Sequence, residues 1–213
     1  IVVLCLGVSA CLWVTSVLIV DFARLDHRGL LQAIRNQEVM PSLKVVQAAI
    51  ADYERGLRYV PCSAALHSER SLLLAYVADK AMASPDMDAA DDALARMQEA
   101  LSAQLACTPN DGKAWLDSAQ MLIHREGFTE RARSAYVMSA QVAPGESWLA
   151  QKRLLFALQF RLLLDAPSRA VVAHDILVLE HAHPNRMSAV MAAAEVDSAE
   201  ALRDLFAVAA NDG

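Results

Sequence analysis

The chain has 213 residues, of which 55% are hydrophobic, and it carries a formal net charge of −6 with only seven glycines. So much apolar content with so little glycine and proline favours a helical protein over a β-sandwich or a β-barrel. The acidic balance argues against a nucleic-acid-binding protein, because such proteins need a basic face to displace counterions from phosphates. We therefore expect an all-α protein without a nucleic-acid partner.

Residues 1–20 contain no charged side chain. A helix of that length extends about 30 Å, which matches the hydrocarbon core of a bilayer. We predict a transmembrane helix here; the core of a signal peptide and a buried helix of a globular domain are the alternatives. Gly7, Cys11 and Thr15 recur at every fourth position and predict a face of small side chains that packs against another membrane helix, although small residues are common in any span.

Residues 21–41 are expected to continue the helix as a membrane-proximal extension. No Gly/Ser-rich linker divides residues 42–213, which predicts one domain of paired helices. Pro41 and Ser42 provide a start signal for its first helix. Apolar residues then recur at helical spacing, at Leu43, Val46, Ile50, Tyr53 and Leu57. Two further helices are expected at about residues 64–83 and 88–107.

Four cysteines divide into two pairs of different character. Cys5 and Cys11 lie in the apolar segment and are expected to act as small apolar residues. Cys62 and Cys107 each lie at the end of a predicted helix, too far apart for a CxxC motif. They predict a disulfide in an oxidising compartment, with two buried free thiols as the alternative. Together with the predicted span, the disulfide favours a single-pass protein of the bacterial inner membrane whose soluble domain lies in the periplasm.

The stretch from Pro109 to Pro144 has the pattern of a complete helix-turn-helix unit. It resembles a tetratricopeptide repeat, with one extra residue in the turn near Gly127 and Ser139 at a position where alanine is usual. The resemblance implies an α-solenoid of antiparallel helix pairs whose surface binds other proteins. The positions that carry it are the aromatic, small, small, aromatic and proline residues Trp115, Ala119, Ala132, Tyr136 and Pro144.

The remaining chain predicts another, less regular helix pair at residues 148–164 and 169–182. Trp148 and Pro184 correspond to Trp115 and Pro144, although at a longer spacing. Two short helices, at about residues 186–195 and 199–209, complete the chain. We expect the tryptophans at repeat positions to pack in the core. Lys152, Arg153 and Arg161 are expected on an exposed helix face, either lining a concave surface or simply solvated.

No phosphate-binding glycine loop, nucleophile elbow or H-E-x-x-H motif is present. His174, His181 and His183 form the most suggestive cluster. Histidines that bind one metal from a helix usually lie three or four residues apart, whereas these lie seven and two apart. We therefore expect no metal, no cofactor and no catalytic residues.

These observations predict a membrane-anchored, non-cytoplasmic helical-repeat scaffold. The chain would be an interaction subunit of an envelope protein complex and not an enzyme, with other membrane or envelope proteins as its partners. By analogy with membrane-anchored proteins of this kind, an envelope machinery is the expected setting. One alternative is an accessory subunit that docks mainly through its transmembrane helix, and another is a metal-dependent enzyme built around the three histidines. The oligomeric state is not predicted.

Overall fold

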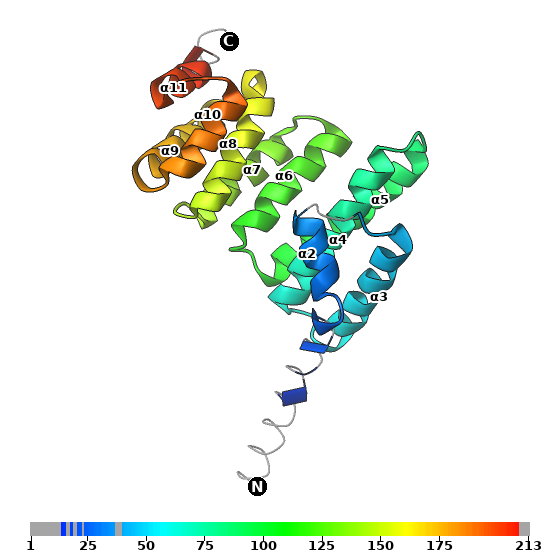
Figure 1. Cartoon of the computed structure of the whole chain (residues 1–213). Coiled ribbons are helices and arrows are strands. Elements are labelled where there is room, and N and C mark those ends of the chain that lie inside the picture. The colour runs from blue at the N-terminus through cyan, green and yellow to red at the C-terminus, as the bar shows by residue number, and fades with distance from the viewer. Residues whose placement is uncertain (1–13, 16–17, 19–20, 23, 37–39, 209–213) are drawn as a thin grey trace. The chain divides into compact units, whose positions relative to one another are not determined.

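The computed structural model describes residues 14–15, 18, 21–22, 24–36 and 40–208 (Figure 1). Within these ranges all the regular structure is helical, which confirms the all-α prediction. The chain divides into two compact units, residues 1–109 and residues 110–213, and each is described by itself.

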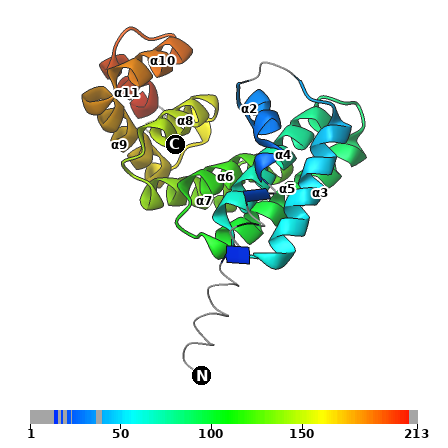
Figure 2. The same cartoon turned by 60° about the horizontal axis from the view of Figure 1, so that its bottom comes forward.

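In the first unit, α4 is the central helix, since α2, α3 and α5 all pack against it (Figure 2). The predicted apolar stripe of α3 is buried at Val46, Ile50, Tyr53 and Leu57. The bounds of the helices are α2 (Arg28–Asn36), α3 (Leu43–Tyr59), α4 (Ala64–Met82) and α5 (Met87–Cys107). Two short polar side chains begin α4 and α5 as N-caps, because Ser63 and Asp86 accept backbone N–H groups of the first turns.

A buried carboxylate ties the start of the first unit to α4. Glu69 is only 6% exposed and accepts hydrogen bonds from Arg24 Nε at 3.0 Å and from the Tyr53 hydroxyl at 3.0 Å. The hydroxyl of Tyr76 donates to the carbonyl oxygen of Pro41 at 2.8 Å. Both ends of the segment between Arg24 and Pro41 are therefore held against α4.

Cys62 and Cys107 form a disulfide, as their positions at helix ends predict, with their Cα atoms 5.1 Å apart. The bond joins the turn after α3 to the last residue of α5. It therefore closes a loop that contains all of α4 and α5.

The second unit is a stack of three helix pairs in two layers. One layer consists of α6, α8 and α10 and is called the first layer here; α7, α9 and α11 form the second layer. Contacts of α8 with α6 and α10, and of α9 with α7 and α11, define these layers (Figure 1). The bounds are α6 (Gly112–Glu126), α7 (Glu130–Val142), α8 (Ser147–Gln159), α9 (Ala166–Ala182), α10 (Pro184–Ala194) and α11 (Ala199–Val208), with a short 3-10 helix at Arg161–Leu163.

Burial in the second unit recurs at a nearly constant interval. The buried residues of α7 return 36 positions later in α9, and several buried residues of α8 and α9 return 34 positions later in α10 and α11. A constant interval is the signature of a helical repeat, in which each pair buries its apolar face against the next. At the interval of 36, the residues of α7 that correspond to Ser168, Val171, Val172, Asp175 and Ile176 of α9 are Ala132, Ala135, Tyr136, Ser139 and Ala140. At the interval of 34, the residues that correspond to Met187, Val190, Leu202 and Phe206 are Arg153, Phe156, Ser168 and Val172.

The predicted membrane span is not supported. None of the helices in the part of the chain that the structure describes is long and apolar enough to cross a membrane. The two longest, α4 and α5, carry charged residues along their length, such as Glu69, Lys80, Asp92 and Glu99, whereas a span requires about 20 predominantly apolar residues. This finding overturns the predicted single-pass inner-membrane protein with membrane partners and a periplasmic domain. Most of residues 1–20, including Gly7 and Cys11, lies outside the described residues.

Candidate functional site

Most of the repeat-signature residues form the core and do not make a site. Ala119, Ala132 and Tyr136 are at most 1% exposed, and the Tyr136 ring stacks on that of Phe156 with centroids 5.2 Å apart. Trp115 is half-buried on α6, and Pro144 is exposed just after α7. The three buried residues pack between α6, α7 and α8, so they position a surface without being part of one.

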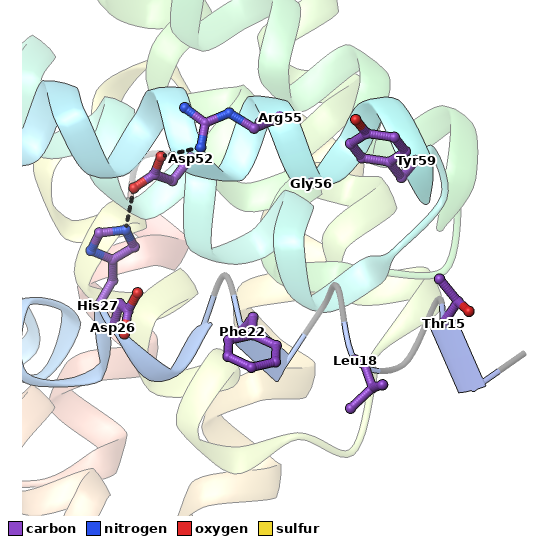
Figure 3. Close-up of a pocket in the computed structure, with 9 residues that line it drawn as sticks. All are labelled: Thr15, Leu18, Phe22, Asp26, His27, Asp52, Arg55, Gly56 and Tyr59. Carbon is purple, nitrogen blue, oxygen red and sulfur yellow. Dashed lines mark hydrogen bonds and ion pairs between the residues drawn. The ribbon is translucent and has the colours of Figure 1, made fainter.

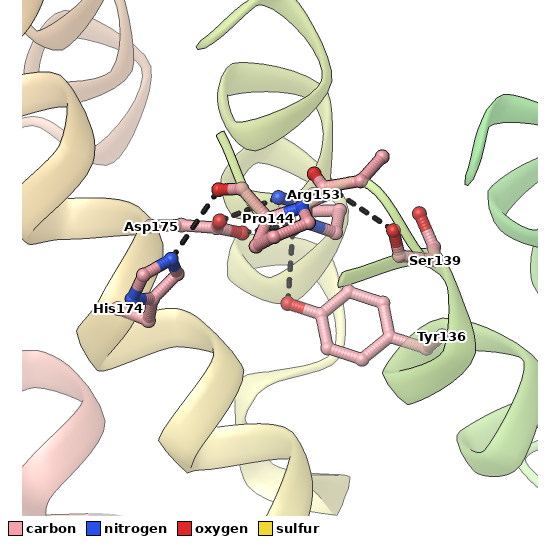
Figure 4. Close-up of polar contacts among 7 residues, drawn as sticks. Tyr136, Ser139, Pro144, Arg153, His174 and Asp175 are labelled. Atoms are coloured by element: carbon pink, nitrogen blue, oxygen red, sulfur yellow. Dashed lines mark hydrogen bonds and ion pairs between the residues drawn. The ribbon is translucent and has the colours of Figure 1, made fainter. Parts of the chain in front are cut away.

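A buried arginine connects the two layers of the second unit (Figure 4). Arg153 lies on α8, is completely buried and binds Asp175 of α9 through two hydrogen bonds of 2.7 and 2.6 Å. Its Nη1 atom also donates to the carbonyl oxygens of Ser139 and Ala143 at the end of α7. Those carbonyls belong to the last turn of a helix, where no intrahelical partner is available. Both predicted locations for Arg153, a concave face or a solvated one, are therefore wrong.

The electrostatics of this cluster indicate a structural role. Burial raises the pKa of the Asp175 carboxyl, and the hydrogen bonds and charge of Arg153 oppose that rise. Burial also raises the pKa of Tyr136, whose hydroxyl donates to the carbonyl oxygen of Arg153. Asp175 is as completely buried as Arg153, so no substrate could reach the pair. It fixes the position of α8 between α7 and α9.

With its buried side occupied, α8 exposes a continuous stripe on the outer face of the first layer. The stripe consists of Trp148, Lys152, Leu155 and Gln159, which follow one another at spacings of four, three and four residues. Trp148 is 36% exposed and Leu155 is 39% exposed, so the expectation that Trp148 belongs to the core is wrong. The Lys152 ammonium lies 5.8 Å from the centre of the Trp148 ring. Two large apolar side chains thus flank a lysine on the central helix of the layer.

The neighbouring helices add charge to the same face. Asp117 of α6 and Arg186 of α10 lie 35 positions before and 34 positions after Lys152, which makes them its counterparts in the adjacent repeats. Asp117 is paired with Lys113, while Arg186 donates to the amide oxygen of Gln151 at 3.0 Å. Neither Lys152 nor Arg186 forms an ion pair with a residue in the described ranges. The outer face of the first layer is therefore locally positive on an acidic protein.

The first unit contains a half-open pocket of about 400 Å³ between its N-terminal segment and α3 (Figure 3). Leu18, Phe22 and Tyr59 supply its apolar surface. At its polar end, the Asp52 carboxylate accepts a hydrogen bond from His27 Nε2 at 3.1 Å and forms an ion pair with the Arg55 guanidinium at 3.0 Å. Asp52 is thus paired with both His27 and Arg55, and the exposed surface of the pocket is largely apolar. Thr15, predicted to pack in a membrane, lines this pocket.

Two of the three histidines make separate local contacts with backbone carbonyl oxygens. His174 Nε2 lies 3.3 Å from the carbonyl oxygen of Pro144, and His181 Nδ1 lies 2.9 Å from that of Leu177. Across the residues that the structure describes, no group of three or more histidine, cysteine or acidic side chains is placed to hold a metal ion.

In fold, the second unit belongs to the class of all-α helical-repeat domains. No protein-family model, curated protein or solved structure matches the chain. The arguments for its function therefore rest on its own residues. The exposed stripe of α8 was detectable in principle, because Trp148, Lys152 and Leu155 share one helical face. Two of these three residues are large and apolar, however, and such residues are expected to face the core.

Proposed function

We propose that the chain is a helical-repeat scaffold that holds a segment of another polypeptide on the outer face of the first layer. The observation that carries this proposal is the stripe of Trp148, Lys152 and Leu155 on the central helix of the layer. Aromatic side chains are enriched at protein interfaces, and tryptophan is among the residues that most often carry the binding energy. The resemblance to tetratricopeptide repeats supports the same role.

The positive charge on the outer face of the first layer indicates which charge the partner segment carries. Lys152 and Arg186 contribute two positive charges without a carboxylate partner among the described residues, while the chain as a whole has a net charge of −6. Opposite charges across an interface set specificity and speed association. The partner segment is therefore acidic and carries one or two large apolar side chains that contact Trp148 and Leu155.

The test uses the purified full chain as bait to select binders from a library of random peptides displayed on phage. The affinities of the enriched peptides for the chain are then measured. We expect acidic peptides with aromatic or aliphatic residues. Lys152→Glu should weaken their binding about fivefold to tenfold, because it reverses a charge at the centre of the face. Leu155→Glu should weaken it further by removing an apolar anchor.

Leu177→Glu is the matched control. Leu177 is 49% exposed, against 39% for Leu155, but it lies on α9 in the second layer. Its substitution should leave the affinity of the selected peptides unchanged. The proposal fails if the selection enriches basic peptides or none, or if Leu177→Glu weakens binding as much as Leu155→Glu.

A further inference from the structure

A second pocket lies at the edge of the first layer, where α8 and α10 both end. It is half-open, like the pocket of the first unit, and its volume is about 630 Å³. Leu158, Phe160 and Leu163 provide apolar surface, and Leu163 is 51% exposed. Gln159, the last residue of the exposed α8 stripe, also lines this pocket, whereas Trp148, Lys152 and Leu155, which carry the proposed peptide binding, do not.

Two opposite charges line this pocket without neutralising each other. Arg161 follows the end of α8 and Glu195 follows the end of α10. Both are exposed, and neither forms an ion pair with the other or with another described residue. One pocket therefore presents a free guanidinium, a free carboxylate and an apolar wall.

The backbone at Glu195 is unusual for a residue with a side chain. Its φ and ψ angles are 57° and 39°, and it is the one non-glycine residue in the described ranges with a positive φ. The N–H groups of Glu195 and Val196 close the end of α10 on the carbonyls of Ala192 and Met191, a helix ending in which glycine is strongly favoured at this position.

Glu195 is also unfavourable electrostatically, because the carboxyl end of a helix carries a partial negative charge. No basic residue lies in the last turn of α10 to offset it. Residues with a strained backbone cluster at ligand-binding and active sites, and Glu195 combines such a backbone with a repulsive charge at a pocket. Together, Glu195 and the end of α10 make this side of the pocket a site for a cation.

We propose that this pocket binds a small zwitterion with an apolar side chain, of the chemical class of a free aliphatic amino acid. The ligand's ammonium group contacts Glu195 and the carboxyl end of α10. Its carboxylate pairs with the Arg161 guanidinium, and its side chain lies against Leu158 and Leu163. No single charged group on a ligand would satisfy both charged residues.

The test is isothermal titration of the full chain with three ligands that share one apolar skeleton. L-leucine carries both charges, 4-methylpentanoate carries only the carboxylate, and 3-methylbutylamine carries only the ammonium. We expect saturable binding of L-leucine with a dissociation constant below about 1 mM, and at least about tenfold weaker binding of the other two. Equal binding of all three, or no binding of L-leucine, overturns the proposal.

Two variants locate the site. Glu195→Gln removes a charge at constant side-chain size, Arg161→Gln removes the guanidinium, and each should weaken L-leucine binding by about fivefold to tenfold. Glu200→Gln and Arg131→Gln, at exposed positions away from the pocket, are the matched controls and should bind L-leucine as the unaltered chain does. Circular dichroism of each variant verifies folding. L-leucine binding that is unaffected by Glu195→Gln overturns the assignment.

This proposal is tested separately from the peptide-binding face, since Gln159 is the one residue that the pocket shares with the α8 stripe. Glu195→Gln should leave the affinity for the selected peptides unchanged, and Leu155→Glu should leave the affinity for L-leucine unchanged. Failure of one proposal therefore does not decide the other.

Discussion

Ser139 and Asp175 stand at equivalent positions of successive repeats, 36 residues apart, and Arg153 binds both of them. The Arg153 guanidinium donates hydrogen bonds to the carbonyl oxygen of Ser139 on α7 and to the carboxylate of Asp175 on α9. All three residues are completely buried. A polar contact thus replaces apolar packing at the point where α7, α8 and α9 meet.

Removing one partner of this pair should destabilise the second unit strongly. Arg153→Met leaves the Asp175 carboxylate buried without its cation, and we expect a loss of about 3–5 kcal/mol in the free energy of unfolding. The double variant Arg153→Met/Asp175→Leu should recover part of that loss, because it leaves no buried charge but still deprives the carbonyl oxygens of Ser139 and Ala143 of their donor. Urea unfolding followed by circular dichroism measures both.

The exposed pair of Arg203 and Glu180, with side chains 42% and 37% exposed, is the control. Arg203→Met should change the free energy of unfolding by no more than about 1 kcal/mol. A double variant at 153 and 175 that is no more stable than Arg153→Met would show that lost packing, and not the unpaired charge, explains the effect.

Reduction of the disulfide should affect the first unit alone. The bond closes a loop over a sequence separation of 45 residues, and on the chain-entropy model its loss lowers the free energy of unfolding by roughly 3–4 kcal/mol. Residues 110–213 contain no cysteine. Hydrogen exchange measured by mass spectrometry with and without dithiothreitol should show faster exchange in α4 and α5 and unchanged exchange in α7 and α9. The variant Cys62→Ser/Cys107→Ser should reproduce the reduced pattern, and equal acceleration in α9 would contradict the prediction.

Asp165 should stabilise α9 in a pH-dependent manner. Its carboxylate caps the helix by accepting the Ser168 N–H at 3.0 Å. Partial burial raises the pKa of Asp165, but the hydrogen bonds from Ser168 and the charge of Arg133 outweigh burial, so the pKa lies below its ordinary value of 3.8. A lowered pKa means that this stabilisation is present above the pKa of the unfolded chain and is lost as the pH falls through the folded value.

Asp165→Ala should therefore lower the free energy of unfolding by about 1 kcal/mol at neutral pH, as the loss of an N-cap does. The difference from the unaltered chain should shrink in acid, which urea unfolding at a series of pH values would measure. Asp204→Ala, at an exposed position within α11, serves as the comparison and should show little difference at any pH. A constant penalty for Asp165→Ala across the series would contradict the charged cap.

Gly112 should tolerate no side chain, although it begins a helix. A Cβ atom there would lie 2.6 Å from the Cβ of Ala143, 2.9 Å from a methyl group of Leu149 and 3.0 Å from the carbonyl oxygen of Ser139. Gly112→Ala should lower the free energy of unfolding by about 1–3 kcal/mol through overpacking. Gly29→Ala, where a Cβ meets nothing within 4 Å, should leave stability unchanged or raise it by up to about 1 kcal/mol. Thermal unfolding of both variants distinguishes the two environments.

Glu195→Gly should stabilise the second unit. Glycine adopts the left-handed conformation without the steric penalty that Glu195 meets, so we expect a gain of about 1 kcal/mol. Glu195→Ala retains the Cβ atom and should gain less. Their unfolding midpoints in urea provide the comparison, and equal midpoints would show that the strain at residue 195 is negligible.

Local patterns predict the helices of this chain well. Ser42, Ser63 and Asp86 precede the starts of α3, α4 and α5, and Pro144 follows the end of α7, because start and end signals act within a few residues. The apolar stripe of α3 is buried as its spacing predicts, apart from Leu43, which is 43% exposed. The apolar character of residues 1–20, in contrast, led to a membrane assignment that the described helices do not support.

The sequence by itself determined the all-helical class, most helix positions and the pairing of Cys62 with Cys107, because periodicity and capping are local and the chain has few cysteines. Only the tertiary structure decided which of the basic residues on α8 is buried. Lys152 and Arg153 are neighbours, yet one is exposed beside Trp148 and the other is completely enclosed. That difference depends on α7 and α9, which supply carbonyls and a carboxylate from segments distant in the sequence, and the stability of a buried charge depends on such partners.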